Sequence, residues 1–393
     1  MIYKRINIFV LIIFFAITCT GCWDNRSLTD IGILAAMGID KKDDLYQVTY
    51  QIVKPGVIKS GSSNSGSSGE NKAFWTYSSE GETIFDAIRN SLSTTDQKIY
   101  FNYIQIIVLG EELARDGIKE VLDFLERDPE FARTPYLLVV KEGLAKDIIE
   151  AESKQEDIPA MHITDIIENN KSFARIRDIN FIEVLNRFNQ EYNEVVTGKI
   201  EIVSQENEEL FVKNLKVIGS AVFRKDILVG WLSGEETRGL LFVENAVANT
   251  VMVVPNPEDR NKKVSIEIKK SETSINIEFK EYKPSFLIEI NAEGNLAGQQ
   301  GPGNLTEGTL LKELEKFVEE KIKTEVQTVL DKARVELKSD FLDFSGTINK
   351  NDYRKWNNIK DNWEDLFPEV VINVEVSYKM RQSGLVRQRT LVR

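Results

Sequence analysis

The sequence predicts an α+β protein built from three mixed α/β domains in tandem, with a long amphipathic helix in the last domain. Three observations lead to this prediction. Helical and extended patterns alternate over residues 46–188, extended patterns predominate over residues 199–290, and one apolar stripe at helical spacing covers residues 306–339. A chain of 393 residues is also longer than one hydrophobic core usually serves.

The chain begins with the parts of an export signal. Lys4 and Arg5 precede an uncharged apolar run, Ile6–Ile17, which is shorter than the ~20 residues needed to span ~30 Å of hydrocarbon. Thr20-Gly21-Cys22 resembles the end of a bacterial lipobox, with Cys19 at the position usually held by leucine. We expect residues 1–21 to form a signal peptide, with cleavage after Gly21 and lipid attachment to Cys22. The alternatives are an ordinary cleaved signal peptide and an uncleaved anchor.

Charge and cysteine content narrow the class of protein. Loss of residues 1–21 removes Lys4 and Arg5 from the 50 basic residues and none of the 62 acidic ones, so the net charge changes from −12 to −14. Phosphate and anionic head groups repel such a chain, so we expect no nucleic-acid binding and no electrostatic membrane attachment. Cys19 would leave with the signal peptide. Cys22 would then carry the lipid, which leaves no cysteine for a disulfide, a metal site or a nucleophile.

We assign residues 22–197 to the first mixed α/β domain. The Ser/Gly-rich stretch Ser60–Gly69 is too polar to pack, and we interpret it as an enlarged hairpin loop between the strands Tyr46–Val53 and Phe74–Tyr77. Apolar residues at helical spacing predict a helix with Ile84, Phe85, Ile88 and Leu92, and a second over Glu111–Arg127 ended by Asp128-Pro129. Further strands are expected over Ile104–Leu109 and Tyr136–Val140, and further helices over Ile158–Asn170 and Phe181–Phe188.

We assign residues 198–295 to a β-rich middle domain. Strands are expected over Lys199–Val203, Leu215–Phe223 and Ile227–Trp231, and a helix over Glu235–Asn245. Several strands then follow from Thr250 to Ile290. Because apolar Val264, Ile266 and Ile268 alternate with polar residues, they predict a sheet that is wet on one side. The Gly/Pro-rich stretch Ala292–Gly303 predicts the next boundary.

Residues 296–393 form the predicted C-terminal domain. Its long helix, Thr306–Ser339, would be ~50 Å long at 1.5 Å per residue. A strand with one apolar face follows, from Val370 to Met380. The opposite face of this strand and the residues after it are basic, which indicates either a solvated strand face or a patch for an acidic partner. These basic residues are Lys379, Arg381, Arg387, Arg389 and Arg393.

The sequence predicts neither a catalytic nor a metal site. His162 is the one histidine, so a His-containing triad, zinc site or acid–base pair would each depend on it. It lies in a predicted amphipathic helix, where a structural role is the usual one. Acidic neighbours such as Glu235-Glu236 are expected by chance among 62 acids, and none stands out as a catalytic pair. We expect no enzymatic activity and no cofactor.

Several sequence segments, which follow one another in the same order along the chain, resemble segments of a known family. Cys22-Trp23-Asp24-Asn25-Arg26 matches a Cys-Trp-Asp-x-Arg start, and GSAVFRKDILVGWLSGEETRGLL (Gly219–Leu241) is the most distinctive stretch. With these segments in order, the chain resembles the Ger(x)C family, the lipoprotein C subunits of spore germinant receptors. The other matching segments are Gly38–Asp40, Tyr50–Gly56, Gly81–Leu92, Leu113–Pro135, Leu337–Phe344, Trp356–Trp363 and Met380–Gly384.

The resemblance implies three mixed α/β domains and a non-enzymatic subunit of a nutrient receptor complex that triggers germination. It implies a location on the outer face of the spore inner membrane, beside polytopic subunits of A and B type. Trp23, Asp24 and Arg26, or the basic C-terminal strand, are the candidate partner contacts. Two other classes remain open. A solute-capturing lipoprotein of a transporter would need two lobes around a cleft, and an envelope hydrolase would need a purely carboxylate site.

Overall fold

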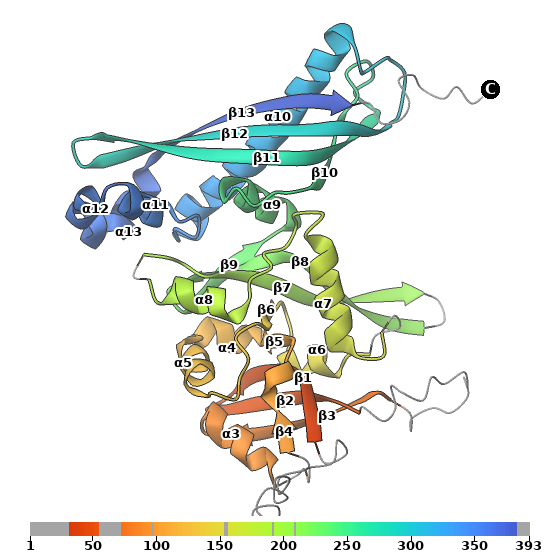
Figure 1. Ribbon diagram of the computed structural model, residues 1–393, viewed down its shortest axis with the longest axis vertical. Helices are drawn as coiled ribbons and strands as arrows, with labels where there is room; N and C mark the ends of the chain where they lie inside the picture. The colour runs from red at the N-terminus through yellow and green to blue at the C-terminus, as the bar shows by residue number, and fades with distance from the viewer. Residues whose placement is uncertain are drawn as a thin grey trace, which may run out of the picture.

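Two β-sheets organise the protein (Figure 1). The computed structural model describes residues 31–54, 72–93, 95, 98–152, 156–190, 192–207 and 210–382. Its strands are β1 (Ile31–Lys42), β2 (Leu45–Val53), β3 (Phe74–Gly81), β4 (Lys98–Tyr100), β5 (Ile106–Leu109), β6 (Tyr136–Val140), β7 (Val196–Asn207), β8 (Leu210–Arg224), β9 (Ile227–Leu232), β10 (Thr250–Pro255), β11 (Lys263–Lys280), β12 (Lys283–Gln299) and β13 (Val371–Gln382).

Helices pack against both sheets. The α-helices are α3 (Ile84–Ser91), α4 (Glu111–Asp116), α5 (Lys119–Arg127), α6 (Ala145–Glu150), α7 (Pro159–Asn170), α8 (Phe181–Phe188), α9 (Gly234–Val243), α10 (Gly308–Asp331), α11 (Phe344–Asn351), α12 (Tyr353–Ile359) and α13 (Trp363–Leu366). A π-helical turn, Lys332–Glu336, extends α10. None of the helices in the described part of the chain is both long and apolar enough to cross a bilayer.

The first sheet has nine strands in the order β3-β2-β1-β5-β6-β7-β8-β9, with β4 beside the start of β1. The central strands β1, β5, β6 and β7 run parallel, and antiparallel pairs flank them on both sides. Parallel neighbours need crossover connections, which here are made by the helices between β5 and β7. The central strands are therefore covered on both faces.

Strand β5 shows this double burial directly. Ile106 and Val108 point into one hydrophobic cluster, with α6 and α7, whereas Ile107 and Leu109 point into the other, with α3, α4, α5 and α8. All four side chains are 0% exposed. A strand buried on both faces has no polar alternation, so a continuous apolar run is what its sequence shows.

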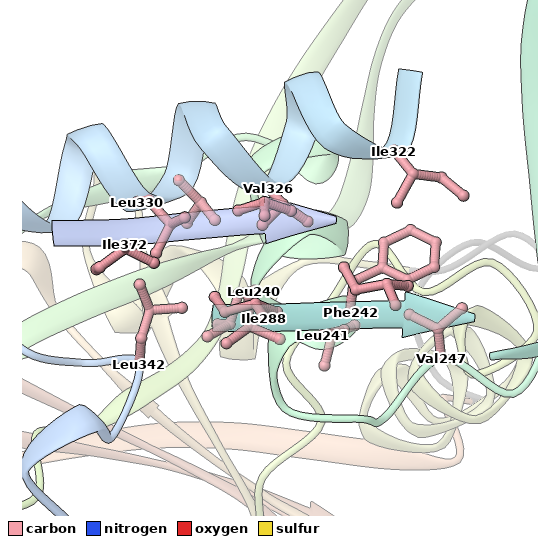
Figure 2. Packing of buried hydrophobic residues seen from close by; sticks show 14 of the residues in the cluster. Leu240, Leu241, Phe242, Val247, Ile288, Ile322, Val326, Leu330, Leu342 and Ile372 are labelled. Carbon is pink, nitrogen blue, oxygen red and sulfur yellow. The ribbon is translucent and has the colours of Figure 1, made fainter. Parts of the chain in front are cut away.

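The second sheet has the order β10-β11-β12-β13 and is covered on one face by α9 and α10. Figure 2 shows the apolar stripe of α10 lying over β13 and facing α9 and β12. In β13 the even-numbered residues from Ile372 to Met380 are buried or half-buried and the odd-numbered ones are exposed, as its alternation predicts. The cluster is continuous with Val196, Val222 and Leu232 of the first sheet, so the two sheets share apolar packing.

The observed fold confirms the α+β class and most of the expected elements. Strand β6 and helix α8 have the predicted bounds, and the long amphipathic helix is present as α10. The single helix expected over Glu111–Arg127 is wrong, because the chain breaks at Gly117, whose φ is 137°, into α4 and α5. Strand β1, which pairs in parallel with β5, was not expected from the sequence.

Both expected domain boundaries fall inside strands. The boundary at 197/198 lies in β7, which pairs with β6 before it and β8 after it. The change to a strand-rich sequence pattern near residue 198 coincides with a switch from parallel to antiparallel strand pairing within one sheet. The boundary at 295/296 lies in β12, which continues to Gln299 despite its glycines. Since each sheet is continuous across the expected position, neither boundary separates two sheets.

Candidate functional site

Several residues singled out from the sequence lie outside the described residues. These are Gly21, Cys22, Trp23, Asp24 and Arg26 at the start, Ser60–Gly69, and Arg387, Arg389 and Arg393 at the end. Lys379 and Arg381 are described, and both are exposed on β13. The Arg381 guanidinium donates to the carboxylate of Glu293 with an Nε–Oε2 distance of 2.8 Å, which lowers the pKa of Glu293. Part of the expected basic patch is therefore neutralised by an acid.

His162 lies on α7 and is half-buried. Over the described ranges, no group of three or more His, Cys, Asp or Glu side chains is placed to hold a metal ion. In the segments that resemble the family, several polar residues are buried and form hydrogen bonds inside the protein.

Asp40 ends the Gly38–Asp40 segment and is 2% exposed. Its two carboxylate oxygens accept hydrogen bonds from the backbone N–H groups of Ala145 and Lys146, at 2.8 and 2.9 Å. These are donors in the first turn of α6, which have no partner within the helix. Burial raises the pKa of Asp40, and the two backbone hydrogen bonds oppose that rise. Asp40 thus fixes α6 on β1 as a structural cap.

Asp340 holds two family-like segments together. Its Oδ1 accepts from the backbone N–H of Phe344 at 3.0 Å, and its Oδ2 accepts from Ser345 N–H at 2.8 Å and from Trp363 Nε1 at 3.0 Å. The carboxyl is buried, and burial raises its pKa to about 7 against the lowering effect of these donors. The segment Leu337–Phe344 is joined in this way to the Trp356–Trp363 region.

Two buried serines connect the same region to the first sheet. The Ser339 hydroxyl donates to the carbonyl of Phe223 at 2.9 Å, and the Ser345 hydroxyl donates to the carbonyl of Tyr192 at 2.7 Å. Both serines are at most 1% exposed. These two hydrogen bonds join residues that are 116 and 153 positions apart in sequence. They fix the C-terminal helices to the end of the first sheet.

The Gly219–Leu241 segment contributes a buried ion pair. Arg238 of α9 meets Glu325 of α10 through two hydrogen bonds, and its Nη1 also donates to the carbonyl of Val251 at 3.0 Å. Planar bidentate pairing of this kind fixes geometry as well as charge. Asp40, Arg238 and Asp340 of the family-like segments are therefore structural residues inside the protein.

A groove of about 970 Å³ lies between α3 and α5. These helices lie at the end of the molecule remote from the second sheet (Figure 1). Phe85, Ile88 and Leu92 of the α3 segment face it, and Phe124 comes from α5. The other lining residues are Tyr46, Thr83, Ile84, Arg89, Ser91, Ile99, Phe101, Lys119, Glu120, Asp123, Arg127, Asp128, Pro129 and Glu130. We call this hollow the α3/α5 groove.

Aromatic rings form the base of the α3/α5 groove. The ring centroid of Phe124 lies 6.3 Å from that of Phe85 and 5.5 Å from that of Phe131, which in turn lies 4.5 Å from Phe101. Phe131 and Phe101 are buried, whereas the Phe85 side chain is 47% exposed and that of Leu92 is 54% exposed. A rigid buried base under exposed apolar side chains is the arrangement found at protein-binding surfaces.

The groove was not identified from the sequence. Ile84, Phe85, Ile88 and Leu92 correctly indicated a helix, but they belong to two faces of it. Ile84 packs in the core with Ala87, and Phe85 and Leu92 face outward. In the sequence of α3, the apolar residues form a stripe that is wider than one buried helix face needs. Only the positions of the neighbouring helices and strands show which part of this stripe is left uncovered.

A second hollow of about 620 Å³ lies where the C-terminal helices meet the first sheet. It is mostly polar, and Arg224, Lys225, Asp226, Glu194 and Glu364 contribute to its lining. Lys225 pairs with Glu364 across it, at 3.0 Å between Nζ and Oε1. Its charges are therefore partly satisfied by the protein itself, and its lining includes the structural Asp340.

Comparisons with known proteins extend over nearly the whole chain. The model described as "Spore germination protein N-terminal domain" matches residues 24–202, and the one described as "Spore germination B3/ GerAC like, C-terminal" matches residues 218–384. Spore germination protein KC of Bacillus subtilis (strain 168) is 26% identical over 390 residues, covering 96% of this chain and 95% of that protein. Spore germination protein B3 of the same organism is 29% identical over 403 residues, covering 98% and 99%.

A solved structure gives the same result for the fold. The crystal structure of the GerBC protein matches with a TM-score of 0.56 and 24% identity, covering 91% of this chain and 99% of that one. This similarity shows a shared fold over nearly the full length of both chains.

Proposed function

The chain belongs to the Ger(x)C family of spore germination proteins, and from this premise we propose that it is a lipid-anchored, non-enzymatic subunit of a nutrient germinant receptor. The observation that carries the proposal is the consecutive match of both family domains, over residues 24–202 and 218–384. Together they account for the folded part that follows Cys22.

The anchor in this proposal is a diacylglyceryl group on Cys22, exposed after cleavage behind Gly21. The apolar run Ile6–Ile17 is too short to span a bilayer, and Thr20-Gly21-Cys22 follows it directly. The acidic balance of the chain supports a covalent anchor, because anionic lipid would repel the net charge of −14 that remains after cleavage. We place the folded part on the outer face of the spore inner membrane.

The proposed action is binding, not catalysis. The buried polar groups that a catalytic site would use are occupied in structural contacts: Asp40 caps α6, Glu325 pairs with Arg238, and Asp340 accepts three hydrogen bonds. The proposed partners are the polytopic A- and B-type subunits of the receptor. A lipid anchor confines the protein to the surface where such subunits are embedded and so raises its effective concentration beside them.

The proposal is tested by the nutrient response of spores that lack this protein. In a strain without redundant homologues, deletion should abolish or strongly slow germination by the nutrient of this receptor. Wild-type protein supplied in trans should restore the response, and a Cys22→Ala variant should not. Germination at the wild-type rate in the deletion strain would overturn the proposal.

A further inference from the structure

The α3/α5 groove presents an apolar helix face that is only partly covered. On α3, Ile84 and Ala87 are buried, whereas Phe85, Ile88 and Leu92 line the groove at spacings of three and four residues. Phe85 contacts Phe124, and Phe85 and Leu92 remain about half exposed. Contiguous apolar surface of this kind, with charged residues around it, marks an interaction site on a protein that is otherwise acidic.

The groove is larger than a single small nutrient molecule needs. Pockets that enclose drug-sized ligands have volumes of ~300–1,000 Å³, and the groove, at about 970 Å³, lies at the top of that range. An amino acid or a monosaccharide would fill a small part of it. Such nutrients also need converging polar groups, whereas Phe124 and the buried Phe101 form an aromatic base here.

The charges around the groove distinguish a protein partner from a lipid surface. Four acids (Glu120, Asp123, Asp128 and Glu130) and three bases (Arg89, Lys119 and Arg127) line it. Asp123 and Arg127 pair with each other at 2.8 Å, and the Arg89 guanidinium lies over the Phe85 ring at 4.7 Å. Anionic membranes attract clusters of unpaired basic residues. A mixed and partly paired set of charges instead matches the polar flanks of an amphipathic helix.

The position of the groove relative to the proposed anchor indicates where the occupant comes from. Ile31 pairs with Lys98 and Gly32 with Ile99, and Ile99 lines the groove. From Cys22 to Ile31 the chain can span at most ~32 Å even when fully extended. If Cys22 carries the lipid, the start of β1 is held within that distance of the membrane surface. The second sheet, at the opposite end of the molecule in Figure 1, is farther from the anchor along the fold.

We propose that the α3/α5 groove binds an amphipathic helix of a membrane-embedded receptor subunit, lying at or near the membrane surface. This proposal rests on the proposed function, because it takes the lipid anchor and the polytopic partners from it. The occupant would insert apolar side chains at positions i, i+3 or i+4, and i+7 against Phe85, Ile88 and Leu92. Its polar flanks would meet Lys119 and Glu130 at the edge of the groove.

Crosslinking tests which molecule occupies the groove. A photoreactive benzoylphenylalanine replaces Phe85 in full-length lipidated protein in spore membranes, and Tyr353 on α12, which is 67% exposed, is replaced as the control. Irradiation should join position 85 to a polytopic subunit, with at least tenfold less product from position 353. Products with lipid, with a second copy, or within the same chain would overturn the proposal, as would the absence of any product from position 85.

Substitution gives an independent measurement. Phe85→Ser with Leu92→Ser should reduce co-purification of the polytopic subunits at least tenfold at equal protein level. The matched control, Met161→Ser with Tyr353→Ser, also removes two half-exposed or exposed apolar side chains and should reduce it less than twofold. Full co-purification with the groove variant contradicts the groove proposal alone. If wild-type protein co-purifies with no polytopic subunit, the proposed function itself fails.

Discussion

Arg238 and Glu325 hold helix α9 against helix α10 through a buried ion pair. Their side chains are 1% and 4% exposed, and the two hydrogen bonds between them measure 2.8 and 2.6 Å. Gly239, next in sequence, packs on the backbone of Glu325, and a Cβ built there would lie 2.5 Å from the Glu325 carbonyl oxygen. The family-like segment Gly219–Leu241 thus joins the end of the first sheet to the helix that covers the second.

Removal of one partner of this pair should destabilise the fold strongly. Glu325→Ala leaves the Arg238 charge buried without its carboxylate, which typically costs ~3–5 kcal/mol. Urea unfolding of soluble residues 23–393 measures this loss. Asp123→Ala is the control, because it breaks the solvent-exposed pair with Arg127 and should lower stability far less than Glu325→Ala does. Equal losses for both variants would show that the buried pair is not structural.

The buried carboxyl of Asp340 should make stability depend on pH. Its pKa is about 7 in the folded protein, against 3.8 as the ordinary value, because burial disfavours the charged form. Between these values the folded state binds more protons than the unfolded state. Its contribution is therefore complete below pH ~4 and is lost as pH rises towards 7, with a slope of at most ~1.4 kcal/mol per pH unit.

The variant Asp340→Asn isolates this effect, because it removes the titrating group and leaves the others, such as Asp40, in place. The free energy of unfolding, measured from pH 4 to pH 8 in urea, should fall less steeply with pH in the variant than in the wild type. Parallel curves for the two proteins would show that Asp340 does not titrate in this range.

Lipid attachment should depend on Cys22 alone. Spores or sporulating cells labelled with a fatty acid should incorporate it into the wild-type protein, and Cys22→Ala should abolish incorporation. Two acyl chains, at ~0.8 kcal/mol per buried CH₂, suffice for stable attachment. Cys19→Ala is the matched control, because Cys19 lies in the expected signal peptide, and it should retain the label. Label that persists in Cys22→Ala would exclude this residue as the site.

Deletion of Ser60–Gly69 should leave the fold nearly unchanged. The segment has no apolar residue, and it connects β2 to β3 at Val53 and Phe74, which are direct partners in the sheet. A shorter connection can still join strand ends that lie side by side, so the free energy of unfolding should change by less than ~1 kcal/mol. A large drop in the urea midpoint would indicate that the segment packs on the protein.

The sequence predicted the fold class and the amphipathic elements well, because burial on one face leaves a period. Helix α8 has the predicted bounds for that reason. Strand β6 also has the predicted bounds, but its signal is a short continuous apolar run, because its side chains are buried on both faces of the sheet. The sequence of strand β1 shows no alternation of apolar and polar residues, because both faces of the strand are buried. Ala35 and Ala36 lie on one side, and Leu34 and Met37 lie on the other. The predicted domain boundaries fall inside β7 and β12, because the direction of strand pairing depends on neighbours far away in sequence and leaves no local pattern.

The candidate functional residues also include some that local sequence predicts and others that it does not. The anchor at Cys22 is predicted from local sequence alone. The α3/α5 groove depends on which side of α3 the rest of the protein covers, and the spacing of Phe85 and Leu92 is the same for a core face and for a partner face. The Asp340–Trp363 contact joins residues 23 positions apart, and no local pattern indicates it.

The composition of the complex that co-purifies with the tagged full-length protein from detergent-solubilised spore membranes tests whether this protein works as a membrane-anchored partner of polytopic receptor subunits. Mass spectrometry should find the lipidated protein together with A- and B-type polytopic subunits. Both subunits should be lost from the purified material when Cys22→Ala is used. Recovery of the lipidated wild-type protein without either polytopic subunit would show that it is not such a partner.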